Sequence, residues 1–281
     1  MHEVIFLWVL AFAFIVFAVI QDIRTREIAN WLNFSLIIFA LGFRFFYSLF
    51  TGDNFSFFLS GLIGLGIFFV IGNLFYYSRL FAGGDAKLMI ALGAILPLST
   101  SFFLNVQNFL NFLLIFLFSG FVYTVLASAF LCIKNFKNFK KEFTHQFEEK
   151  RKLSYIFLSV GIVSLLFGFI EVLFTFLGLI IFVTFYLYLY SKAIDECCMI
   201  KTISVDKLRE GDWLYSNVKI GNKMIKAKWD GLNKREIKEI IKHQKSVKIR
   251  EGIVFSPVFL LAFTLWIISV LSGIDLWNSF W

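Results

Sequence analysis

Long apolar stretches constrain this chain more than any other feature of its sequence. A helix that spans a membrane needs about 20 apolar residues, within a usable range of about 17–25. The first half of the chain offers such stretches at Val4–Gln21, Asn33–Phe50, Phe55–Tyr77, Leu88–Leu104 and Phe109–Ile133. Hydrophobic residues make up 59% of the sequence, and its mean hydropathy is +0.80. A soluble domain does not carry so much apolar surface, so the sequence predicts a polytopic α-helical membrane protein.

The net charge of +8 is concentrated in two segments between apolar stretches. Lys134–Lys152 contains 7 Lys or Arg residues, and Lys192–Arg250 contains 15. Cytoplasmic loops of membrane proteins carry an excess of Lys and Arg. Both segments are therefore predicted to be cytoplasmic, and no nucleic-acid partner is expected.

The apolar run Leu153–Tyr190 has 38 residues, too many for one crossing and suitable for two. A single crossing would place the two basic segments on opposite sides of the membrane. A hairpin with its turn near Gly168–Glu171 keeps both on the cytoplasmic side. The alternative is one long tilted helix that contains Glu171. With a last span from about Ile253 to Leu271, the hairpin gives about eight transmembrane helices.

The second basic segment has the pattern of a small α+β domain inserted before the last helix. Alternating apolar and polar residues indicate half-buried strands, and an Asn before an apolar-periodic run indicates a helix start. The expected elements are strands at Lys201–Lys207, Trp213–Ile220, Lys226–Trp229 and Ser246–Arg250, and a helix at Lys234–His243 with Asn233 as its N-cap.

These patterns predict five consecutive regions. They are a transmembrane bundle at 1–133, a basic cytoplasmic linker at 134–152, a transmembrane hairpin at 153–191, a small cytoplasmic α+β domain at 192–252, and a last transmembrane helix with its tail at 253–281.

Two acidic residues stand at the borders of apolar stretches. Asp22 closes the first stretch and Asp85 opens the fourth. Two crossings lie between them, so both carboxylates are predicted at the same membrane face. Acids at such positions are costly and commonly functional. Taken singly, Asp22 also fits a helix end neutralised by Arg24 or Arg26, and Asp85 fits an N-cap. Their shared location favours a functional pair.

Two carboxylates a few ångströms apart share a proton, because both cannot ionise easily. One can then activate water while the other protonates a carbonyl oxygen or a leaving amine, which is peptide hydrolysis without a metal. Gly83 and Gly84 are expected to allow unusual backbone angles and the close approach of an extended substrate. The alternative is a flexible turn between helices. With three Cys, three His and no C-x-x-C, neither a metal nor a cofactor is expected.

Three segments resemble archaeal preflagellin and prepilin peptidases, which are membrane aspartyl proteases with a G-x-G-D motif. Asp22–Trp31 resembles the first catalytic motif, although Ala29 replaces the usual proline. Gly83–Lys87 resembles the second, with Ala82 in place of the first glycine. Arg250–Phe263 is similar to the carboxy-terminal region of the archaeal members, so that the resemblance covers most of the chain.

The resemblance implies an aspartic endopeptidase of the plasma membrane, with its active site facing the cytoplasm. Its substrate would be a precursor archaellin or type IV pilin-like protein, cleaved between a short basic leader and an apolar helix. No cysteine-rich loop is present, so peptidase activity alone is expected. The implied residues are Asp22 and Asp85 as the catalytic pair, and Gly83, Gly84, Lys87, Arg24 and Asn30 as residues that shape the site or bind substrate.

Two other classes use membrane aspartates. A proton-coupled transporter would favour acids near the bilayer midplane and inverted repeats, and the sequence has neither. A presenilin-like intramembrane protease cuts within a span, and its proline-alanine-leucine motif is missing here. The depth and separation of the two carboxylates distinguish an enzyme from a transporter.

Overall fold

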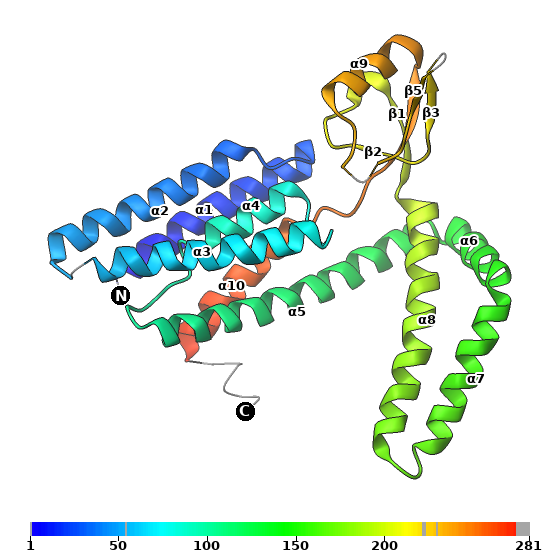
Figure 1. The fold of residues 1–281 in the computed structure, drawn as a ribbon, viewed down its shortest axis with the longest axis horizontal. Coiled ribbons are helices and arrows are strands. Elements are labelled where there is room, and N and C mark those ends of the chain that lie inside the picture. Colours follow the sequence, from blue (N-terminus) through cyan, green and yellow to red (C-terminus); the bar gives the residue numbers. More distant parts are fainter. Residues whose placement is uncertain (1, 54, 221–222, 229, 274–281) are drawn as a thin grey trace. The chain divides into compact units, whose positions relative to one another are not determined.

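A computed structural model describes residues 2–53, 55–220, 223–228 and 230–273. The chain divides into two compact units (Figure 1). The first unit is 1–124 together with 254–281, and the second is 125–253. Residue 229 at the end of one predicted strand, and residues 274–281 of the predicted tail, lie outside the described residues.

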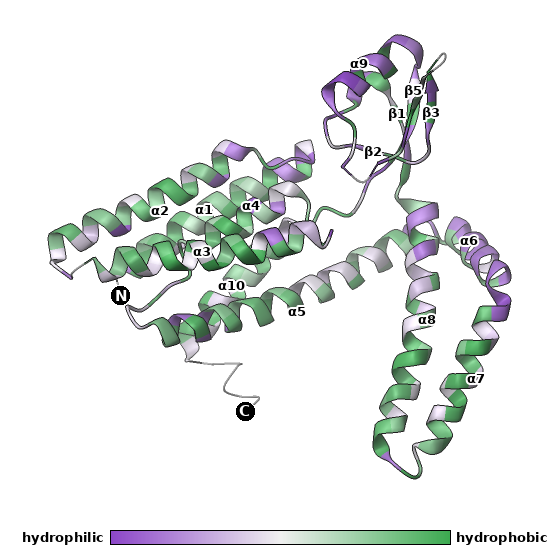
Figure 2. Cartoon of the chain, in the orientation of Figure 1, coloured by the Kyte–Doolittle hydropathy of each residue, from purple (hydrophilic) through white to green (hydrophobic). Residues whose placement is uncertain are grey.

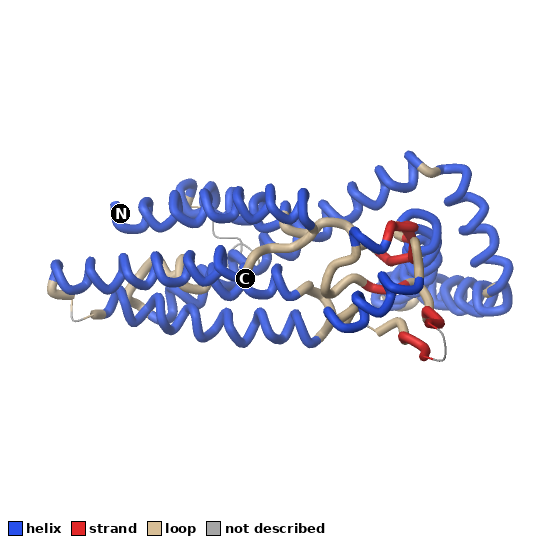
Figure 3. Tube along the Cα trace, turned by 90° about the horizontal axis from the view of Figure 1, so that it is seen from above, coloured by secondary structure: helices blue, strands red, loops and turns tan. Residues whose placement is uncertain are grey.

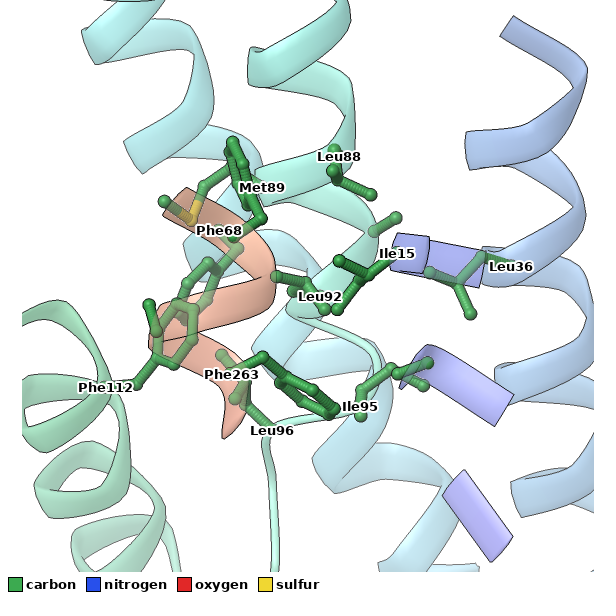
Figure 4. Close-up of a cluster of buried hydrophobic side chains, with 14 of the residues drawn as sticks. Ile15, Leu36, Phe68, Leu88, Met89, Leu92, Ile95, Leu96, Phe112 and Phe263 are labelled. Atoms are coloured by element: carbon green, nitrogen blue, oxygen red, sulfur yellow. The ribbon is translucent and has the colours of Figure 1, made fainter. Parts of the chain in front are cut away.

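The first unit is helical, and its long helices run lengthwise beside one another (Figure 3). Its elements are α1 His2–Thr25, α2 Asn30–Thr51, α3 Ser56–Tyr77, α4 Gly83–Leu92, the first part of α5 Phe102–Lys134, and α10 Pro257–Ser272. Side chains from every one of these helices meet in one apolar core (Figure 4). Ile15 of α1, Leu36 of α2 and Phe68 of α3 each have no solvent exposure there.

Five helices within the described residues are long and apolar enough to cross a membrane: Glu3–Thr25, Asn30–Thr51, Ser56–Tyr77, Phe102–Lys134 and Val172–Cys198. The helix α10, with 16 residues, is apolar but shorter. The predicted multi-pass helical architecture is therefore confirmed, whereas a count of eight spans is not.

The prediction of a continuous span at Leu88–Leu104 is wrong. The helix α4 has 10 residues and ends at Leu92, so it is about 15 Å long and covers about half of a bilayer core. Gly93 follows as its C-cap, and Pro97 prevents the chain from resuming a regular helix. No α-helix is present again until α5 begins at Phe102.

Buried side chains satisfy the irregular backbone after α4. Arg44 of α2 has no solvent exposure, and its guanidinium donates to the carbonyl oxygens of Ala94 at 2.9 Å, Ile95 at 3.2 Å and Pro97 at 2.6 Å. The side-chain oxygen of Asn105 accepts from the N–H groups that follow, those of residues 98 and 99. Irregular backbone at membrane depth is tolerated only when protein groups satisfy it in this way.

Glycines let α4 and the loop after it lie close against α3. A Cβ added at Gly93 would stand 2.6 Å from the carbonyl oxygen of Gly64, and one added at Gly72 would stand 2.7 Å from Cγ1 of Ile90. Small residues at helix interfaces permit such close packing in membranes. The glycines of α3 therefore help to place the N-terminal end of α4, which carries Asp85.

The second unit contains a helical hairpin at the predicted position. The hairpin consists of α7 Arg151–Phe167 and α8 Val172–Cys198, with the turn at residues 168–171. The helix α6 Phe136–Glu149 precedes it. A Cβ at Gly178 would stand 2.9 Å from the carbonyl oxygen of Gly161, so α7 and α8 pack closely. The predicted basic linker is largely the helix α6, which Figure 2 shows as mainly hydrophilic, beside apolar stretches in α7 and α8.

The small domain follows α8. Its strands are β1 Ile200–Ser204, β2 Trp213–Leu214, β3 Val218–Ile220, β4 Lys223–Ile225 and β5 Ser246–Arg250, and its helices are the 3-10 turn Val205–Lys207 and α9 Lys234–His243. An antiparallel sheet has the order β1-β5-β2, and β3 pairs with β4.

The helix Lys234–His243 and the strand Ser246–Arg250 are confirmed, and Asn233 caps α9 within a capping box. The predicted continuous strand Trp213–Ile220 is wrong, because β2 pairs with β5 whereas β3 pairs with β4. The strand expected at Lys226–Trp229 lies earlier, at Lys223–Ile225, and 226–228 is not a strand. Where a strand ends depends on the strand with which it pairs. The alternation of apolar and polar residues along one segment does not specify that partner.

Candidate active site

Asp22 lies in the last turn of α1 and is half-buried. Its carbonyl oxygen accepts a hydrogen bond of 2.8 Å from the N–H of Arg26, which has a left-handed φ of 59° and ends the helix. The side-chain oxygen of Gln21 then accepts from the N–H of Ala29 at 3.2 Å. These bonds fix the path of the short connection to α2 and hold the end of α1 that bears the carboxyl group.

Asp85 lies in the first turn of α4, as its third residue, and is only 8% exposed. Its Oδ1 is buried and has no hydrogen-bond partner within the described residues. An acidic side chain at a helix N-terminus is favoured by the helix dipole, which accounts for the residue type. It does not account for a buried oxygen without a donor, since a buried polar atom is normally paired.

The fold brings the two acids to the same end of the first unit. In Figure 1 the C-terminal end of α1 and the N-terminal end of α4 lie at that end. The carboxyl group of Asp22 is close enough to act electrostatically on that of Asp85. The prediction from the crossing count, that both lie at one end, agrees with this arrangement even though α4 does not span. Among the described residues, no group of three or more His, Cys, Asp and Glu could hold a metal ion.

Gly83 and Gly84 begin α4 and have different surroundings. A Cβ at Gly84 would stand 3.1 Å from Cβ of Ile28, so this position is small because the α1–α2 connection packs on it. A Cβ at Gly83 would meet only Cε2 of Tyr76, at 3.8 Å. Neither glycine has a positive φ. The expectation of unusual backbone angles is therefore wrong, and close approach is what Gly84 supplies.

Lys87 and Asn30 meet beside the pair. The Nζ of Lys87 donates a 2.6 Å hydrogen bond to Oδ1 of Asn30, which joins the start of α2 to the second turn of α4. Arg24 is exposed and has no ion pair within the part of the chain that the structure describes. Three of the five residues predicted to shape the site, Gly84, Lys87 and Asn30, are thus engaged in packing or a hydrogen bond.

A groove of about 510 Å³ lies between α2, α3 and α4. Gly83 and Lys87 are in its wall, which continues with polar residues of α2 and α3 and with apolar side chains further along all three helices. The lining residues are Asn33, Phe34, Ile37, Leu65, Phe69, Asn73, Tyr76, Tyr77, Gly83, Ala86, Lys87 and Ile90.

Sequence reasoning did not single out Asn33 or Arg44. Both lie in the apolar stretch Asn33–Phe50, where a polar or ionisable residue is a signal in its own right. Arg44 supports the backbone after α4, and Asn33 borders the groove. A polar residue within an apolar stretch could have been noted as a candidate from the sequence. The groups that surround Arg44 and Asn33 come from other helices, which only the fold brings near.

Comparison with known proteins identifies the relatives of this chain. Residues 8–132 match the model of the type IV leader peptidase family. A preflagellin peptidase of Methanococcus maripaludis is 34% identical over 83 residues, which are 30% of this chain and 35% of that protein. One of Methanococcus voltae is 29% identical over 154 residues, 51% of this chain and 61% of that protein.

A third preflagellin peptidase, of Methanocaldococcus jannaschii, is 31% identical over 80 residues, 28% of this chain and 33% of that protein. The chain thus covers from one third to about three fifths of these relatives. No solved structure matches it significantly. The resemblance to archaeal preflagellin and prepilin peptidases is confirmed. The family match includes both aspartates and ends before Arg250–Phe263.

Proposed function

We propose that this chain is a membrane-embedded aspartic endopeptidase that removes the short basic leader of a preflagellin or type IV pilin-like precursor. The observation that carries the proposal is the convergence of Asp22 and Asp85 at one end of the first unit, within the segment that matches the leader peptidase family. A peptidase of this type needs two carboxyl groups at the level where the basic leader meets the apolar helix of its substrate.

In the proposed mechanism the two carboxyl groups share one proton. The ionised group removes a proton from a water molecule, whose oxygen attacks the carbonyl carbon of the scissile peptide bond. The protonated group donates to the amine as the C–N bond breaks. The Oδ1 of Asp85 suits this chemistry, because no group among the described residues occupies it and its hydrogen-bonding capacity is left for water or substrate. Asp22 is half-buried and is therefore the more accessible member of the pair.

The positions of the acids favour a peptidase over a proton-coupled transporter. Asp22 is in the last turn of the 24-residue α1, and Asp85 is in the first turn of α4. Both are terminal positions, as expected for a site at the membrane boundary, whereas a transporter favours acids near the bilayer midplane. We place this boundary at the cytoplasmic face. The basic segments Lys134–Lys152 and Lys192–Arg250 favour the cytoplasmic side, and the predicted number of crossings puts both acids on the same side as these segments.

Lys87 and Asn30 are proposed to hold the two catalytic segments in place. Their hydrogen bond couples the start of α2 to α4 and so fixes the two segments that follow Asp22 and Asp85. Gly84 contributes in the same way, through its close packing against Ile28. Arg24, which is exposed beside the pair, is proposed to contact substrate as it enters.

The test is to incubate membranes that contain the protein with preflagellin and pilin precursors, and to sequence the new amino termini. Cleavage between the basic leader and the apolar segment is expected. Asp22→Asn and Asp85→Asn should each abolish it while the protein still inserts and folds, since neither carboxyl group alone serves as both acid and base. Full activity in either purified variant would falsify the assignment.

A further inference from the structure

We propose that the groove between α2, α3 and α4 is the docking site for the precursor. In this proposal the groove receives the backbone near the cleavage point and the first turns of the apolar helix that follows. This inference rests on the proposed function and adds to it the place where the substrate lies. The alternative occupant, a membrane lipid, is an outcome of the test below.

The groove changes from polar to apolar along its length. Lys87, Asn73 and Tyr76 line it near the end of the first unit where the acids lie, as their places at the start of α4 and the end of α3 require. Ile37 and Leu65 line it further from the acids. A precursor with a basic leader before an apolar helix makes the same change. Apolar walls with a few placed polar groups are typical of a binding site.

Asn33 provides the observation that points to a peptide. It is 1% exposed, and neither its Oδ1 nor its Nδ2 has a hydrogen-bond partner within the described residues. A buried amide without partners is costly. In contrast, the amide of Asn105, also buried, donates to one backbone group and accepts from two. A free donor and a free acceptor on one side chain complement a peptide group, whereas a lipid ester offers acceptors only.

The groove leads to the acids through Gly83. This residue lines the groove, lies two positions before Asp85, and has no side chain, so that the only atom near the position of a Cβ is Cε2 of Tyr76, at 3.8 Å. A backbone that rises out of the groove can therefore pass closely over the start of α4. Asp85 itself is buried and is not in the groove wall. Substrate would thus approach the carboxyl pair across Gly83.

Site-specific photocrosslinking tests the location. A benzoylphenylalanine would replace Phe34 or Phe69, which line the groove and are 56% and 58% exposed. Phe39, on the same helix as Phe34 and 57% exposed, lies outside the groove and is the matched control. The experiment uses the full chain with Asp22→Asn, so that bound precursor is not consumed. We expect precursor adducts at positions 34 and 69, and none above background at 39.

Two crosslinking results would overturn the proposal. The first is an equal yield of precursor adducts at all three positions. The second is adducts with lipid only at positions 34 and 69, while the protein with Asp22 intact cleaves the same precursor. In the latter case the proposed function stands and the groove is a lipid site. If no precursor is cleaved by the unmodified protein, the proposed function fails first.

The Asn33→Leu variant gives an independent test. It removes an unsatisfied buried amide, so the melting temperature should stay the same or rise. The loss of about two hydrogen bonds to substrate should raise KM by roughly 5- to 30-fold, with little change in kcat. A lower melting temperature with unchanged KM would show that Asn33 serves only the fold and would remove the main argument for a peptide in the groove.

Discussion

Replacing Arg44 should unfold the region that places Asp85. Its guanidinium makes five hydrogen bonds, four to main-chain carbonyl oxygens and one to the hydroxyl of Ser60. Three of these carbonyls belong to the backbone after α4, and the fourth belongs to Phe57 of α3. Arg44→Met keeps most of the apolar stem and removes every donor. The three carbonyl oxygens after α4 then lose this partner in a buried environment, whereas the carbonyl oxygen of Phe57 still accepts from the hydroxyl of Ser60.

The expected loss is large compared with the stability of a protein. An unsatisfied buried acceptor costs about 1–3 kcal/mol. Three such groups put the destabilisation on the order of 3–9 kcal/mol before any relaxation, against a total stability of about 5–15 kcal/mol. Water cannot replace the lost donors within hydrocarbon, so relaxation is limited. Arg44→Lys should recover only part of the loss, because an ammonium group has three donors and lacks the planar fork.

Thermal unfolding of the purified protein in detergent measures this prediction. Arg44→Met should give no cooperative transition, or one at a far lower temperature, and should lose precursor cleavage as well. Arg235→Met is the control, since Arg235 is exposed on α9. An Arg44→Met protein that unfolds near the temperature of the unmodified chain would refute the view that this side chain holds the broken segment together.

Three further outcomes are expected. Gly64→Val should lower the melting temperature strongly, because a Cβ there would press on Pro97 and on the backbone after α4, whereas Gly66→Val, with open space around its Cβ, should not. The main-chain N–H of the N-cap residue Asn233 holds the pKa of Glu236 below its ordinary value. The ionised Glu236 therefore stabilises α9 fully at pH values above the ordinary pKa, and this stabilisation is lost as the pH falls through the lower pKa of the folded state. Hydrogen exchange of the α9 amides should report this acid loss, and Glu236→Gln should remove its pH dependence. Finally, Lys141→Cys and Lys219→Cys, both at exposed positions, should be labelled from the cytoplasmic side in sealed vesicles, and opposite patterns would reduce the number of spans by one.

The sequence by itself determined the membrane character, most helix positions and the candidate acids. Apolar stretches of sufficient length predict helices because a buried backbone must satisfy its own hydrogen bonds. The same local logic predicted α9, with Asn233 as its cap, from a few neighbouring residues. Asp22 and Asp85 could be paired from the number of intervening stretches, since that inference needs only chain direction. These features depend on interactions within one segment.

Tertiary structure decided what those segments do together. The run Leu88–Leu104 is apolar enough for a span, but it breaks after α4 because Arg44 and Asn105, from two other helices, satisfy its irregular backbone. The hydropathy of a segment does not show which residues of other helices will hydrogen-bond to its backbone. The glycines of α3 and α4 likewise have meaning only through the atoms opposite them, as Gly84 has through Ile28. The groove and its unpartnered Asn33 arise from three helices at once, so no single stretch of sequence could predict them.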